Sequence, residues 1–90
     1  MIVLVSETTV GTLGTADVGV ANLWERDYVD AAGRARNGVT ARLMWESDGA
    51  PESLIVGVGS RFELGGARWE VLAVEKRVGV NGAVRLLRLG

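Results

Sequence analysis

The sequence predicts an all-β domain, a small sandwich or barrel of about six to eight short antiparallel strands. Apolar residues occur in short runs separated by turn residues, and no stretch of helical length follows the 3.6-residue period. Glycine is frequent, with 13 residues, whereas proline occurs once. Two strand–loop–strand segments are also similar to each other, which favours a fold built from a duplicated hairpin.

The repeat lies within a single expected domain, residues 1–90. A Val-Gly pair, Val10-Gly11 and then Val58-Gly59, comes shortly before each copy. The paired segments are residues 16–24 with 38–43 and residues 67–75 with 82–87, within repeat-like halves of about 10–46 and 58–90. A duplicated hairpin indicates a fold, and it does not by itself indicate a chemistry.

The expected strands, in chain order, are residues 2–5, 9–13, 17–25, 38–45, 53–58, 61–64, 67–76 and 83–89. Residues 39–45 alternate between apolar and polar side chains, as a half-buried strand does. Residues 2–5, 54–56 and 71–74 are instead apolar on both faces. Such strands bend around a small barrel, are covered by loops, or pack against another chain. We favour a protein partner or self-association, because a large exposed apolar patch usually marks an interaction site.

Three connections carry clear turn signals. Residues 47–51 form a Ser-Asp-Gly-Ala-Pro turn, Gly65-Gly66 fits a two-residue hairpin turn, and Asn81-Gly82 is the usual type I′ pair. Residues 27–37 are expected to form a long polar loop, whereas the second copy connects the same strands with residues 77–81. The fold therefore does not require the extra length, and a long loop on a β scaffold is a favoured place for binding residues.

The composition excludes most catalytic chemistry. The chain has no cysteine and no histidine, which removes disulfides, the usual nucleophile–base pairs and the ordinary zinc ligands. Glu25, Asp27 and Asp30 lack the spacing of a calcium loop. Glu63 and Glu70 fit an exposed ion-pair lattice with nearby arginines better than a catalytic dyad. Residues 57–60 fail the phosphate-loop pattern, so we expect no enzyme activity, cofactor or metal.

Charge and hydropathy indicate a cytoplasmic protein. The formal net charge is −1, which argues against nucleic acid as a partner. Residues 1–5 are apolar but too short for the core of a signal peptide, and no stretch approaches the roughly 20 apolar residues that span a bilayer. We therefore expect no membrane association.

The candidate binding residues lie around the long loop, where aromatic and arginine side chains gather. Tryptophan and arginine are enriched in interface hot spots. Trp69 leads an apolar row and is instead expected in the core. The candidates are Trp24, Arg26, Tyr28, Arg34, Arg36 and Trp45. They predict a non-enzymatic protein-interaction or assembly module, with a homo-oligomer as one form of it. The alternative is a β-barrel that binds a small molecule or a single-stranded nucleic acid between Trp24 and Trp45.

The second half of the chain also resembles a known group of sequences. Residues 58–74 combine Val-Gly, an aromatic residue, Gly-Gly and tryptophan with alternating valines, and residues 84–89 close the segment. This pattern resembles small uncharacterised all-β proteins of high-GC Gram-positive bacteria, mainly over residues 54–89. The resemblance implies an all-β fold and transfers no activity or functional residue.

Overall fold

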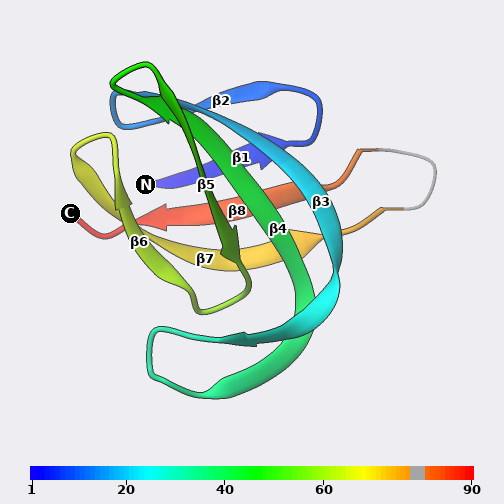
Figure 1. Ribbon diagram of the computed structural model, residues 1–90. Helices are drawn as coiled ribbons and strands as arrows, with labels where there is room; N and C mark the ends of the chain where they lie inside the picture. Colours follow the sequence, from blue (N-terminus) through cyan, green and yellow to red (C-terminus); the bar gives the residue numbers. More distant parts are fainter. Residues whose placement is uncertain (78–80) are drawn as a thin grey trace.

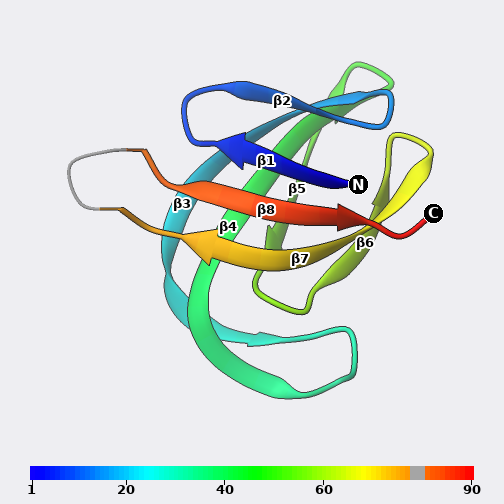
Figure 2. The ribbon, with the colours of Figure 1, turned by 180° about the vertical axis from the view of Figure 1, so that it is seen from behind.

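Eight β-strands form two four-stranded antiparallel sheets that pack face to face, in a computed structural model that describes residues 1–77 and 81–90 (Figures 1 and 2). The strands are β1 (Ile2–Ser6), β2 (Val10–Leu13), β3 (Ala16–Val29), β4 (Ala35–Ser47), β5 (Ala50–Val56), β6 (Arg61–Leu64), β7 (Ala67–Glu75) and β8 (Ala83–Arg88). Sheet A has the order β1-β8-β7-β6, and sheet B has the order β2-β3-β4-β5. The fold is therefore an all-β sandwich, as the sequence predicts, and not a closed barrel.

All eight expected strands are present, although several bounds differ. Residues 78–80, part of the short connection expected in the second copy, lie outside the described residues. The described part of the chain holds no helix that is long and apolar enough to cross a membrane.

The two sheets are related by an exchange of the two halves of the chain. Exchanging β1 with β5, β2 with β6, β3 with β7 and β4 with β8 converts the strand order of one sheet into that of the other. The hairpin β3–β4 in sheet B then corresponds to β7–β8 in sheet A. Their registers correspond as well, since Val20 pairs with Leu43 and Val71 pairs with Leu86. Each hairpin has a register shift just after these pairs. Each half of the chain therefore supplies strands to both sheets.

The core lies between the sheets, and Trp69 is its largest fully buried side chain. The indole Nε1 of Trp69 donates a hydrogen bond to the carbonyl oxygen of Leu64 at 3.0 Å, which satisfies its polar atom. The other buried apolar residues are Val5, Leu13, Val18, Val20, Leu23, Ala41, Leu43, Val56, Ala67, Val71, Ala83, Val84 and Leu86. The core position expected for Trp69 is confirmed.

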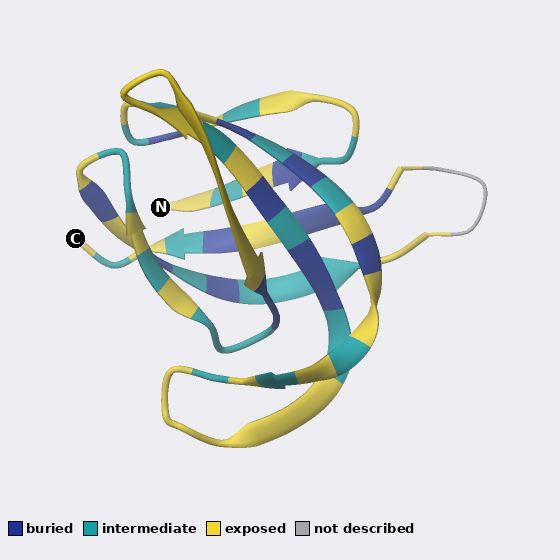
Figure 3. Ribbon diagram, in the orientation of Figure 1, coloured by how far each residue is buried: buried dark blue, intermediate teal, exposed yellow. Residues whose placement is uncertain are grey.

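The outer face of β1 remains uncovered in this chain. Val5 is buried between the sheets, whereas Ile2 and Leu4 point the other way and are 59% and 51% exposed. Figure 3 shows exposed residues at the start of β1 and along the lower end of the β3–β4 hairpin. Among the described residues, neither a sharp bend nor a loop covers Ile2 and Leu4.

The β2–β3 and β6–β7 turns touch through their backbones and join the two sheets. The amide of Thr15 donates a hydrogen bond to the carbonyl oxygen of Gly65 at 3.0 Å. A Cβ at Gly14 would collide with that carbonyl group, and a Cβ at Gly65 would collide with the carbonyl oxygen of Leu13. Both glycines have positive φ, as does Gly66. Gly65 and Gly66 thus form the expected primed hairpin turn.

The contact between the turns predicts different effects of alanine at two neighbouring glycines. Gly66→Ala is expected to lower the free energy of unfolding by about 1 kcal/mol, the usual cost of a left-handed backbone for a residue with a side chain. Gly65→Ala has this cost and adds the collision with Leu13, expected to cost a further ~1–3 kcal/mol. Urea unfolding measures both values. Equal losses would contradict the backbone contact, because no atom lies within 4 Å of a Cβ at Gly66.

Candidate functional site

The stretch expected to be a long loop is a strand extension. Residues 24–40, which we call the hairpin arm, continue the β3–β4 ladder to the pair Val29 and Ala35. Only residues 30–34 form the turn between the strands. The prediction of a loop over residues 27–37 is therefore wrong. Its polar side chains do not prevent pairing, because cross-strand contacts such as Asn37 Nδ2 to Asp27 Oδ1 at 2.9 Å accompany the backbone ladder.

The far end of the hairpin arm is fixed to the connection between β5 and β6. The carbonyl oxygen of Val58 accepts hydrogen bonds from Tyr28 Oη at 2.8 Å and from Arg36 Nη1 at 3.1 Å. The amide of Ala31 donates to the carbonyl oxygen of Gly59 at 3.0 Å. A Cβ at Gly57 would collide with the ring of Tyr28. Residues 57–60 thus form the docking site of the hairpin arm.

Asp30 organises the turn at the tip of the hairpin arm. Its Oδ1 accepts hydrogen bonds from the backbone amides of Ala32 and Arg34 at 2.9 and 3.0 Å, and its Oδ2 lies 3.6 Å from Arg36 Nη1. The amide of Arg34, followed by the amide of Ala32 and the charge of Arg36, holds the pKa of Asp30 below its ordinary value despite partial desolvation. The turn is therefore shaped by a carboxylate rather than by apolar packing.

Trp24 is the main apolar group left exposed on the hairpin arm. It is 53% exposed and follows the register shift in β3. The buried Thr40 donates its Oγ1 hydrogen to the carbonyl oxygen of Trp24 at 3.0 Å, which fixes the backbone there. The guanidinium of Arg26 lies over the indole at 5.3 Å from the ring centroid, within cation–π range. Trp24 and Arg26 thus form one surface, which we call the Trp24 face.

Arginine atoms without partners lie in the same region of sheet B. Among the described residues, the Nε atoms of Arg26 and Arg42 are buried and make no hydrogen bond. Arg26 is therefore held by ring stacking, with no ion pair to another described residue. The charge of Arg26 is therefore not neutralised by an ion pair within the described part of the chain.

The six candidate residues thus fall into four places. Tyr28 and the exposed Arg36 donate hydrogen bonds to the carbonyl oxygen of Val58, Trp24 and Arg26 form the exposed Trp24 face, and Arg34 is exposed in the turn. Trp45 is not with them, because it packs against the core.

The structure does not bring Trp24 and Trp45 together. Trp24 pairs with Thr40, and Trp45 lies five residues further along the same strand. Side chains alternate along a strand, so Thr40 and Trp45 point to opposite faces of β4. The two indoles therefore do not enclose a common ligand site.

The sequence does not identify Asp30 as the turn-forming residue, and it does not identify residues 57–60 as the docking site of the hairpin arm. The sequence identifies Asp30 only as one of three carboxylates, and it identifies residues 57–60 only as a segment that fails the phosphate-loop pattern. The available signal was the pair of glycines, Gly57 and Gly59, which leaves room for Tyr28 and for the side chains of Asp30 and Arg36.

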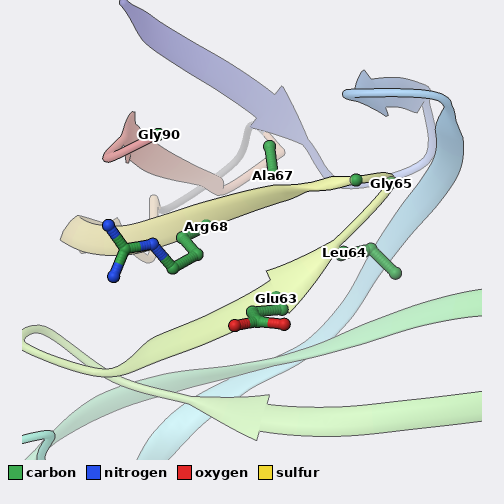
Figure 4. A pocket seen from close by; sticks show the side chains of 7 residues that line it. Glu63, Leu64, Gly65, Ala67, Arg68 and Gly90 are labelled. Carbon is green, nitrogen blue, oxygen red and sulfur yellow. The ribbon is translucent and has the colours of Figure 1, made fainter.

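Only one ion pair of the lattice expected on β6 and β7 is found among the described residues. Arg61 Nε lies 2.7 Å from Glu70 Oε1, whereas Glu63 and Arg68 lie opposite each other in the strand register without forming an ion pair. A hollow of about 490 Å³ lies beside the β6–β7 turn, and the residues that line it include Glu63, Arg68 and Gly90 (Figure 4). It offers one carboxylate and one guanidinium, which do not make a nucleophile–base pair. Within residues 1–77 and 81–90, acidic side chains form no group that could hold a metal ion.

Comparison with family models, with curated proteins and with solved structures finds no match to this chain. The candidate site therefore has to be interpreted from its own geometry.

The capping role of Asp30 predicts a pH-dependent effect of Asp30→Asn. A carboxylate whose folded pKa lies below the ordinary value of 3.8 stabilises the fold above that value, and this contribution is lost as the pH falls through the lower folded pKa. The variant is therefore expected to melt below the unchanged protein at pH 7, and the gap should narrow below about pH 4. Circular dichroism melts at pH 7, 5 and 3 measure the gap. A gap that stays constant would show that the charge of Asp30 does not stabilise the turn.

Proposed function

We propose that the protein is a non-enzymatic protein-interaction or assembly module of the cytoplasm, and that the Trp24 face of the hairpin arm is its recognition surface. The observation that carries this proposal is the half-exposed indole of Trp24 with the guanidinium of Arg26 stacked on it. Tryptophan and arginine are the residue types most enriched at the energetic centres of protein interfaces. Leaving an indole in water forgoes burial that would stabilise the monomer.

The hairpin arm is suited to this role because both of its ends are fixed. The Thr40 hydrogen bond holds the backbone at Trp24, and the bonds to Val58 and Gly59 hold the tip. A partner that binds a preformed surface does not have to order it first, so more of the contact energy appears as affinity. The extra length of β3 and β4 therefore presents the Trp24 face on a backbone that hydrogen bonds hold in place.

The charges of the hairpin arm favour a protein partner over nucleic acid. Residues 25–36 contain three carboxylates and three arginines, so the arm carries no excess of positive charge. Nucleic-acid affinity depends strongly on the number of cations that reach phosphates. Mixed charges around an aromatic centre are instead typical of the polar rim of a protein interface.

The proposal predicts that Trp24→Ala abolishes partner capture while the fold is retained. Because Trp24 is half exposed, the variant should unfold within about 1 kcal/mol of the unchanged protein. A hot-spot residue contributes about 2 kcal/mol or more, so affinity for an isolated partner should fall by roughly 30-fold or more. Affinity capture from source cells followed by calorimetry with the captured protein measures both effects.

Val10→Ala is the matched control, because Val10 is 73% exposed on β2 and lies outside the hairpin arm. This variant should capture the same partner as the unchanged protein. If Trp24→Ala captures the same proteins with the same affinity, the Trp24 face is not the recognition surface.

A further inference from the structure

Strand β1 forms one edge of sheet A and pairs within the sheet only with β8. The amide of Arg88 donates to the carbonyl oxygen of Met1 at 2.9 Å, and the amide of Glu7 donates to that of Gly82 at 2.9 Å. Backbone groups alternate in direction along an antiparallel strand. Odd-numbered residues of β1 therefore bond to β8, and Ile2, Leu4 and Ser6 direct their amides and carbonyl groups away from the sheet.

The free part of this edge is limited to two residues and one further amide. The carbonyl oxygen of Ser6 already accepts hydrogen bonds from the Thr9 amide at 3.4 Å and from Thr9 Oγ1 at 2.9 Å. Within the part of the chain that the structure describes, both backbone groups of Ile2 and of Leu4 remain without a partner, and so does the amide of Ser6. The unpaired edge is thus short and has a defined pattern of donors and acceptors.

The edge of β1 lacks the features that block pairing with other chains. Proteins usually protect an edge strand with charged residues, proline or a bulge. Strand β5 contains Pro51 and Glu52, and β6 contains Arg61 and Glu63. Strand β2 is four residues long, and its Gly11 lies against the side chain of Val5. By contrast, β1 reads Ile-Val-Leu-Val-Ser and contains neither charge nor proline.

We propose that β1 pairs with β1 of a second copy of this chain, in an antiparallel register centred on Val3. Ile2 then lies opposite Leu4 of the second copy, and the four free groups of Ile2 and Leu4 in each copy form four hydrogen bonds across the two-fold axis. A register centred on Leu4 would direct Ile2 toward the carbonyl oxygen of Ser6, which Thr9 already occupies. The free backbone groups of β1 thus complement those of a second copy, and the occupied carbonyl oxygen of Ser6 selects the register.

The side chains and charges agree with this pairing. Ile2 and Leu4 of the two copies alternate on one outer face, beside Leu87 and Arg85 of β8. Because β1 carries no charge, no like charges meet across the new strand pair. The two sheets A join into one continuous sheet, and the closed two-fold contact leaves no further free edge at β1. A strand of five residues gives an interface at the small end of the known range, so the dimer should be weak and concentration-dependent.

This pairing specifies a partner for the proposed assembly role, but it uses a surface other than the Trp24 face.

The test uses the untagged full chain in analytical ultracentrifugation from micromolar to millimolar concentration. Leu4→Glu places a carboxylate on the edge while Arg85 lies opposite it on β8, which keeps the fold stable. The dimer dissociation constant should rise at least about tenfold.

The double variant Ile2→Lys with Leu4→Glu tests the register. In the register centred on Val3, each introduced ammonium lies opposite an introduced carboxylate of the second copy, so dimerisation should recover. In a register centred on Leu4 the two carboxylates would meet, and dimerisation would stay weak. Hydrogen exchange provides a second readout, because the amides of Ile2 and Leu4 should become protected as the unchanged protein dimerises.

Three results would overturn the pairing. The first is an unchanged protein that stays monomeric up to about 1 mM, a concentration at which weak contacts are populated. The second is a dimer that Leu4→Glu leaves intact, and the third is a dimer that the double variant does not restore. Trp24→Ala separates the two proposals, because it should leave β1 pairing unchanged. If Trp24→Ala rather than Leu4→Glu dissociates the dimer, the β1 pairing is wrong while the Trp24 face gains support.

Discussion

The contact between the β2–β3 turn and the β6–β7 turn is the constraint on which the rest of the sandwich depends. It is a contact of backbone against backbone, closed by the hydrogen bond from Thr15 to Gly65, and it allows no side chain at Gly14 or Gly65. The turns belong to equivalent hairpins in opposite sheets. Their contact therefore fixes the position of one sheet on the other, and the core around Trp69 packs between faces whose spacing is already set.

A second set of contacts crosses between the halves of the chain at the opposite ends of the strands. The hairpin arm of the first half docks on Val58 and Gly59 of the second. In the reverse direction, the amide of Gly82 donates to Glu7 Oε1 at 2.8 Å, and Asn81 Nδ2 contacts Thr8 Oγ1 at 2.8 Å. The β3–β4 hairpin thus contacts the connection between β5 and β6, and the residues at the start of β8 contact the connection between β1 and β2. The Trp24 face lies on the longer first hairpin, before the tip residues that contact Val58 and Gly59.

The sequence predicts the strands and turns well because both depend on local signals. Gly65-Gly66 selects a primed turn, and the apolar row that starts at Trp69 identifies a buried face. The hairpin arm is missed because its mixed charges do not alternate with apolar residues. Its strands are stabilised by the ladder and by bonds to Val58, which is distant in the sequence. Tyr28 and Arg36 are predicted as binding residues, whereas in the structure both donate hydrogen bonds to Val58 of the same chain, which no pattern of residue types reveals.

Because each half of the chain supplies strands to both sheets, the strands of the two sheets become available for pairing at different times during synthesis. Sheet B consists of four strands in chain order, so each pairs with a neighbour soon after synthesis. Sheet A needs β1 to pair with β8, which joins the first strand to the last. Such pairing of distant segments is slow because a large loop has to close. Until β8 emerges from the ribosome, β1 lacks this partner strand, so the nascent chain exposes an uncharged strand of the kind that promotes pairing with other chains.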